Sequence, residues 1–223
     1  MAKKESKPTR ERLIEAAQRL FLEKGYEATG VSEILRAAEV NSGSLYYFFK
    51  TKEDLLLAVL DWYVAGLHPM VIDPVFSQVS DPLHRVFAIL SGYRLMLTMT
   101  DCRQGCPIGN LAIEMSEKSE AVREKIALNF TNWRKAIAQC LVDAHDLLPP
   151  ETDAEQLAIF ILTVMEGGVM QARAHRSPET YDASVAMLKD YFRRLTGGRF
   201  TPLDSYDHVF AGAPDGGNAE GGT

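Results

Sequence analysis

The chain has 223 residues, of which 46% are hydrophobic and 24% charged, and its mean hydropathy is -0.11. This balance is typical of a globular protein and excludes a fibrous or largely disordered chain. The three cysteines cannot form a closed disulfide set, and the basic first twelve residues contain no apolar run. The longest apolar stretch, residues 157–165, is too short to span a bilayer. We therefore expect a cytoplasmic protein without a membrane partner.

The net charge of -6 conceals an uneven distribution along the chain. Residues 1–52 carry 10 Lys and Arg against 7 Asp and Glu, whereas the remaining residues carry 14 against 23. Affinity for a polyanion depends on the field of one face rather than on the total charge. The acidic pI of about 5.4 therefore does not exclude nucleic acid as a partner.

Apolar residues recur at helical spacing along most of the chain, and no useful stretch alternates as a strand does. This pattern predicts an all-α fold with a three-helix N-terminal head and a larger helical body. The first two helices are expected to begin at the caps Thr9 and Thr29, and Gly25 is expected to end the first. A third short helix is predicted from Ser44 to Phe49. Thr51 starts a fourth helix with a capping box.

The body follows Pro69 and Pro74, which are expected to end the fourth helix. Its first predicted helices cover residues 82–100, 108–116 and 120–145. Two more begin at Thr152, which opens another capping box, and at the first-turn proline Pro178. We divide the chain into a head (1–56), a body (57–196) and a glycine-rich end (197–223), most of which is expected to be disordered or weakly docked.

The second and third head helices, with a turn that contains Gly43 between them, have the arrangement of a helix-turn-helix. Two segments add a more specific signal, FLEKGYEAT at residues 21–29 and GSLYYFFKTKEDL at residues 43–55. Both closely resemble the N-terminal domain of tetracycline-repressor (TetR) family regulators. The resemblance covers about residues 9–56, and the body is similar to the family in helix order and length. It implies a DNA-binding head and a body that binds a ligand and dimerises.

The third helix carries the candidate groove contacts. Leu45 and Phe49 are four residues apart and are expected to anchor the helix inward. The candidate DNA contacts are Thr29, Ser42, Gly43, Ser44, Tyr46, Tyr47 and Lys52, with the hydroxyls and Lys52 expected on phosphates. Phe48 stands where the family usually has a histidine. The alternative is that the aromatic residues are core and that the basic arm (Lys3, Lys4, Lys7 and Arg10) is only solvated.

Two body helices are candidates for a dimer interface, because a single helix-turn-helix supplies too little specific contact. One is apolar on all sides between residues 157 and 169, and the other has a coiled-coil-like seam. The candidate interface residues are Phe160, Val164, Gly168, Tyr181, Val185, Leu188 and Phe192. The resemblance implies an intermolecular four-helix bundle. The alternative is that both helices pack only within one subunit.

Large and pliable side chains between head and interface suggest an apolar ligand chamber. The candidate ligand contacts are Trp62, Tyr63, Tyr93, Met96, Cys106, Asn110, Glu114, Trp133 and Glu166. For the apolar members the alternative is ordinary core, and for the polar members it is a solvated helix face.

Cys106 is expected at the start of a helix, where the helix dipole lowers the pKa of a thiol and raises its reactivity. Its loop resembles that of electrophile-sensing members of the family. The hypothesis is that modification of Cys106 releases DNA, and a Cys106→Ser protein that still loses DNA on electrophile treatment would refute it. The alternative is an inert buried thiol. Cys102 and Cys106 lack further ligands at suitable spacing, so we expect neither a metal nor a cofactor.

These observations predict a ligand-responsive transcriptional regulator that is not an enzyme. We expect a homodimeric repressor that a small apolar or electrophilic effector releases from a palindromic operator. Its expected partners are double-stranded DNA, a small-molecule effector and a second copy of the chain. The alternatives are a helical enzyme or a small-molecule-binding protein with an inert head. No catalytic triad, phosphate loop or paired-carboxylate motif supports the enzyme.

Overall fold

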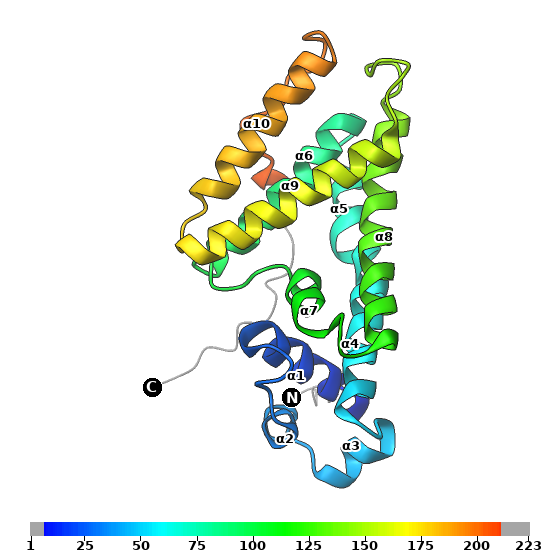
Figure 1. Ribbon diagram of the computed structural model, residues 1–223, viewed down its shortest axis with the longest axis vertical. Coiled ribbons are helices and arrows are strands. Elements are labelled where there is room, and N and C mark those ends of the chain that lie inside the picture. The colour runs from blue at the N-terminus through cyan, green and yellow to red at the C-terminus, as the bar shows by residue number, and fades with distance from the viewer. Residues whose placement is uncertain (1–6, 211–223) are drawn as a thin grey trace, which may run out of the picture.

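The computed structural model describes residues 7–210, and this part of the chain is helical and contains no strand (Figure 1). The all-α expectation is therefore confirmed. The head consists of α1 (Thr9–Lys24), α2 (Val31–Ala38) and α3 (Ser42–Phe48). Helix α4 (Lys52–Leu67) leads out of the head and into the body without a break at residue 56. The head and the body therefore share one helix.

Local sequence explains the head. The inner face of α1 buries Leu13, Ala17 and Leu20 at helical spacing. Asn41 caps α3, because its side chain accepts a hydrogen bond from the Ser44 N–H at 2.9 Å. Thr51 begins α4 with the predicted capping box, in which its hydroxyl and the Asp54 carboxylate each accept a backbone N–H at 3.0 Å.

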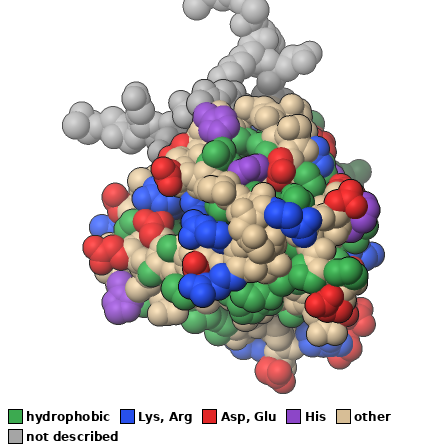
Figure 2. Space-filling model, turned by 90° about the horizontal axis from the view of Figure 1, so that it is seen from above, with side chains coloured by type: hydrophobic (Ala, Val, Ile, Leu, Met, Phe, Trp, Pro, Cys, Tyr) green, Lys and Arg blue, Asp and Glu red, His purple; other side chains and the backbone are tan. Residues whose placement is uncertain are grey.

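The body is a bundle in which α8 lies between α4 and α9, and α10 lies beside α9 (Figure 1). A short π-helical turn, His68–Ile72, joins α4 to the next helix. The body helices are α5 (Asp73–Gln78), α6 (Pro82–Met99), α7 (Pro107–Met115), α8 (Glu120–Asp143), α9 (Ala154–His175) and α10 (Glu179–Leu195). Seen from the end opposite the head, the body displays acidic and basic side chains interspersed with one another (Figure 2).

Two helical stretches, Lys52–Gln78 and Ala154–His175, are long and apolar enough to cross a membrane by length and composition alone. Both also supply core of the bundle: Leu55 and Leu60 of the first and Ile161 of the second are fully buried. Core helices of a globular protein pass the same test of composition. The packing in this structure accounts for their apolar character on the inner faces.

The segment after α10 is ordered as far as the structure describes it. The prediction that most of residues 197–223 are disordered or weakly docked is wrong for residues 197–210, while residues 211–223 lie outside the described part. Phe200, Tyr206 and Val209 are buried, and a short 3-10 helix, η2 (Asp207–Phe210), packs on α6 and α5. Scattered apolar residues without helical period were enough to dock this segment, which the periodicity argument could not detect.

Glu114 joins the body to the head and does not line the ligand cavity described below, contrary to the prediction. Its carboxylate accepts hydrogen bonds from the backbone N–H groups of Tyr26 at 2.8 Å and Glu27 at 2.6 Å. The turn at Gly25 has φ +89°, and a Cβ there would lie 3.0 Å from the Glu114 carboxylate. Lys118 adds an ion pair with Glu27 at 2.7 Å. We call this set of contacts the Glu114 clasp.

The clasp predicts a measurable change in local stability. In a Glu114→Gln variant one charge-assisted acceptor is lost, so the free energy of local opening around Tyr26 and Glu27 should fall by about 1–2 kcal/mol. Amide hydrogen exchange at these two residues should then be roughly tenfold faster. Exposed Glu117, on the next turn of the chain, offers the matched control Glu117→Gln. Unchanged protection of the Tyr26 and Glu27 amides from hydrogen exchange in Glu114→Gln would contradict the inference that Glu114 stabilises this turn.

Candidate functional site

The α3 helix presents aromatic hydroxyl groups at the far end of the head. Tyr47 is 76% exposed and Tyr46 is 51% exposed. Leu45 and Phe49 are buried beneath them, as predicted. The helix is therefore anchored through two side chains, while its outer face remains open to a partner.

The N-terminus of α3 carries the small residues that were predicted to approach DNA. Ser42 and Gly43 are exposed. The Ser44 hydroxyl lies 3.1 Å from the Asn41 side-chain oxygen. Asn41 itself is exposed. Its role as the cap of α3 is not among the sequence predictions, although an Asn before a short helix is a recognisable cap. The three predicted residues stay candidates for DNA contact.

Thr29 cannot make the predicted phosphate contact in this arrangement. Its side chain is fully buried, and its hydroxyl donates to the Gly25 carbonyl at 2.7 Å. Lys52 is half-buried, with its ammonium 4.1 Å from the centre of the Tyr26 ring, and desolvation lowers its pKa. In the arm, Lys7 pairs with Glu15 at 2.6 Å, whereas Lys3 and Lys4 lie outside the described residues.

A cavity of about 400 Å³ lies where the head meets the body. Tyr63, Tyr93, Met96 and Trp133, four of the predicted ligand contacts, line it. The sequence prediction missed the other lining residues, which are Gln18, Leu22, Gly66, Leu67, Met70, Val71, Ile89, Gly92, Gln104, Pro107, Ile108 and Phe210. Gln18 and Leu22 belong to α1, so the cavity touches the head directly. No local pattern in the sequence brings α1 to this wall.

The other predicted ligand contacts lie outside the cavity lining. The Trp62 ring packs edge-on against Tyr63, with ring centres 5.3 Å apart. Asn110 accepts a hydrogen bond from Arg173 at 2.9 Å and thereby joins α7 to α9. Cys106 lies behind the cavity wall, with its sulfur 3.9 Å from the Tyr93 hydroxyl.

Cys106 caps α7 as predicted, but its thiol is not activated. Burial, followed by the negative charge of Glu166, raises the pKa of the Cys106 thiol well above its usual range. Burial also raises the pKa of Glu166 and that of Tyr93. The prediction of a lowered thiol pKa is therefore wrong, because desolvation outweighs the N–H groups at the helix start. Tyr93, Cys106 and Glu166 form a buried cluster that favours neutral groups.

Most of the predicted interface residues pack against other residues of the same subunit. The Tyr181 hydroxyl donates to the Leu90 carbonyl at 2.7 Å, and Phe192 packs edge-on against Phe87, with ring centres 5.5 Å apart. Leu188 is buried, and Gly168 lies against the Tyr181 ring. For these residues the interface prediction is wrong. A helical seam has the same period whether it faces its own subunit or another.

Val185 and Val164 are half-buried, and Val185 lines a groove between α6 and α10 in its own subunit. A different face of α9 and α10 is open and apolar. We call it the outer face, and its exposed members are Ile159, Phe160, Met170, Met187 and Tyr191. Phe160 and Tyr191 connect the two helices, with ring centres 5.8 Å apart. Of the predicted interface residues, Phe160 belongs to this face.

Within residues 7–210, no group of three or more His, Cys, Asp or Glu side chains is placed to hold a metal ion. The described polar groups near the cavity are amides, phenols and the buried Cys106 and Glu166. The cavity lining is mostly apolar and contains no charged side chain among the described residues.

Comparisons with known families cover both parts of the chain. Residues 13–59 match the family model described as bacterial regulatory proteins of the tetR family. Residues 82–188 match the model described as a tetracyclin repressor-like C-terminal domain. The HTH-type transcriptional repressor DhaR of Mycobacterium sp. strain GP1 is 29% identical over 81% of this chain and 90% of its own. The transcriptional regulator AcuR of Cereibacter sphaeroides is 30% identical over 75% and 77%.

Solved structures agree with this assignment. The reduced form of NemR from Escherichia coli matches with a TM-score of 0.72 and 27% identity, over 82% of this chain and 96% of that one. A regulatory protein TetR from Rhodobacter sphaeroides matches with a TM-score of 0.73 and 27% identity, over 86% and 99%. The chain belongs to the tetracycline-repressor (TetR) family of DNA-binding transcriptional regulators.

Proposed function

We propose that the chain is a repressor that binds a palindromic operator as a homodimer and leaves it when a small apolar effector enters the cavity. The observation that carries this proposal is the position of the cavity. Its wall includes Gln18 and Leu22 of the head as well as Tyr93 and Trp133 of the body. A ligand that fits one head position better than another shifts the equilibrium between them.

The open face of α3 supports DNA as the partner. The Tyr46 and Tyr47 hydroxyls are in place to bind phosphates, and the small residues Ser42 and Gly43 let the backbone approach base edges. Two heads read successive major grooves when they are about 34 Å apart. This requirement supports a symmetric operator. A DNA partner in turn supports a cytoplasmic location.

The outer face supports the homodimer. Five large apolar side chains on two adjacent helices are exposed in the single subunit, and two of them, Phe160 and Tyr191, are in ring contact. Exposed apolar side chains that gather in this way mark an interaction site. A second copy would cover the Phe160 and Tyr191 rings with the same residues, as a two-fold interface requires. Two α9–α10 pairs would then form a four-helix bundle.

The lining supports a neutral effector. Among the described residues, the cavity wall contains aromatic, aliphatic and methionine side chains with the amides of Gln18 and Gln104 and the phenols of Tyr63 and Tyr93, but no charged side chain. A charged ligand would lose its hydration without a counter-charge. The raised pKa of Cys106 disfavours the electrophile alternative. The named relatives are regulators, and we assign the same role to this chain rather than catalysis.

Operator recognition is tested by selecting bound duplexes from a random library at near-physiological salt. The expected product is a palindrome whose half-sites are about 34 Å apart. Tyr47→Phe should then bind the selected duplex roughly tenfold more weakly, since it loses one hydrogen bond to a charged phosphate. Its urea unfolding curve should superimpose on that of the wild type, because the exposed ring is retained. A folded dimeric protein that enriches no sequence would contradict the proposal.

The dimer is tested by a charge on the outer face. Met187→Glu should raise the dimer dissociation constant at least about 100-fold, because a buried unpaired carboxylate costs several kcal/mol. Met99 is an equally exposed methionine on α6, at 65% against 69%, so Met99→Glu is the matched control. Sedimentation equilibrium gives both constants. Equal constants for the two variants would place the interface elsewhere.

Thiol reactivity is tested with iodoacetamide at pH 8 and peptide mapping. Only the thiolate reacts, so Cys106 in the folded protein should be labelled at least about tenfold more slowly than in the urea-unfolded chain. Cys140 is a matched control, because burial raises its pKa to about 12. Fast labelling of Cys106 beside slow labelling of Cys140 would restore the electrophile hypothesis.

A further inference from the structure

The last described residue, Phe210, lies far from the rest of the cavity lining in sequence. After α10 the chain returns across α6, and η2 brings Phe210 to the cavity wall. We call residues 199–210 the strap. The other lining residues all lie between positions 18 and 133. The strap therefore adds to the cavity wall a side chain from a distant part of the sequence.

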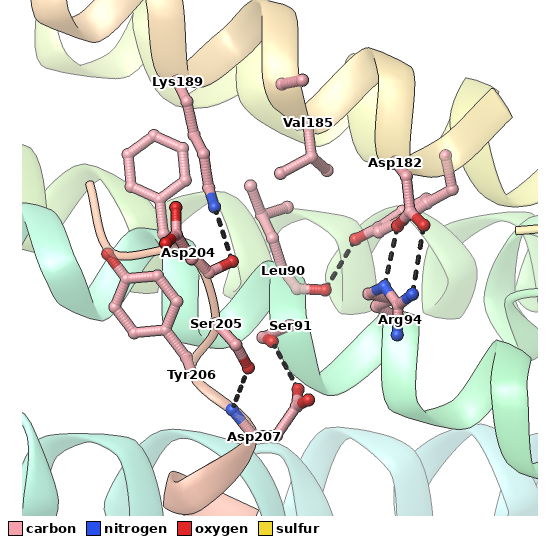
Figure 3. A pocket seen from close by; sticks show the side chains of 13 residues that line it. Leu90, Ser91, Arg94, Asp182, Val185, Lys189, Asp204, Ser205, Tyr206 and Asp207 are labelled. Carbon is pink, nitrogen blue, oxygen red and sulfur yellow. Dashed lines mark hydrogen bonds and ion pairs between the residues drawn. The ribbon is translucent and has the colours of Figure 1, made fainter. Parts of the chain in front are cut away.

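The strap is attached at several points along its length (Figure 3). The Lys189 ammonium donates to the carbonyls of Leu203 at 2.7 Å and Asp204 at 3.1 Å. The Ser91 hydroxyl donates to the Asp207 carboxylate at 3.2 Å. Nearer to the cavity, the Gln78 amide donates to the Val209 carbonyl at 2.8 Å. These contacts hold the chain just before η2 and within it.

An aromatic pair adds to this attachment. His84 Nδ1 and the Tyr206 hydroxyl are 2.6 Å apart, and Tyr206 is buried. The Phe200 ring lies over His84, with ring centres 4.8 Å apart. The strap is therefore a packed part of the body, and the position of Phe210 is determined by the fold.

Phe210 fills space that α6 leaves open at Gly92. A Cβ at position 92 would lie only 2.9 Å from the tip of the Phe210 ring. The absence of a side chain at Gly92 is thus what allows the ring to lie against α6. Both residues line the cavity, so the ring is the wall at this point.

We propose that Phe210 determines the size of the effector that the cavity accepts, the effector being a neutral and largely apolar molecule. This inference rests on the proposed function, in which the cavity is the effector site. The ring is held by a fixed strap on one side and has the cavity on the other. A smaller side chain at 210 leaves its volume to the ligand, whereas the rest of the lining stays in place.

The experiment measures binding of three probes by calorimetry: phenol, 1-naphthol and 9-phenanthrol. The ratio of the phenanthrol affinity to the phenol affinity should rise about tenfold or more from wild type to Phe210→Ala, with Phe210→Leu between them. Leu203→Ala is the matched control, since Leu203 is an exposed residue of the same strap outside the cavity lining. The same ratio in wild type and Phe210→Ala would overturn the inference.

A second measurement tests whether Phe210 only lines the cavity or also keeps the strap docked on the body. The Val209 N–H donates to the Tyr206 carbonyl at 3.0 Å, so its hydrogen exchange reports whether the strap stays docked. If Phe210→Ala undocks the strap, Phe210→Leu must show the shifted ratio with Val209 still protected, or the inference fails. If no probe binds to any of the proteins, the inference fails as well, because a wall without a ligand site selects nothing.

Release from the selected operator is measured with the same probes. A shifted size preference without any effect on DNA binding would support the role of Phe210 and refute the effector role of the cavity. DNA release with an unchanged size preference would support the effector role of the cavity and refute the role of Phe210. The two proposals therefore fail separately.

Discussion

The hydrogen bonds that Glu114 accepts from the Tyr26 and Glu27 amides hold the head in its orientation on the body. The head continues into the body through α4, and the Glu114 clasp attaches the two parts at a further point. Both attachments restrict the orientation of the head relative to the body. The cavity lies beside α1, where a small displacement changes the geometry of both attachments.

Tyr93 of the cavity wall lies in a cluster with Cys106 and Glu166, which lie behind the wall. Burial raises the pKa of all three groups, which favours their neutral forms next to an apolar wall. Neutral groups avoid the cost of an uncompensated charge in a medium of low polarity. The same arrangement explains why the pKa of Cys106 is raised, although a helix start by itself favours a lowered thiol pKa.

Features that depend on neighbouring residues could be predicted from the sequence, and features that depend on distant ones could not. The helix order, the Thr51 capping box and the anchors Leu45 and Phe49 follow from local spacing. Thr29, Glu114 and Tyr181 were each assigned to an external partner, yet each binds the backbone of its own subunit. Residue type gives the capacity to hydrogen bond, but only tertiary packing decides the partner.

The strap also fixes the order in which the parts of the protein can be completed during synthesis. Gln78 and Val209, which meet through a hydrogen bond, are 131 positions apart. A ribosome releases the N-terminal end first, so the helices of the head are available long before the final wall of the cavity. The part of the cavity wall that Phe210 forms is consequently completed only after the head and the body helices have been made.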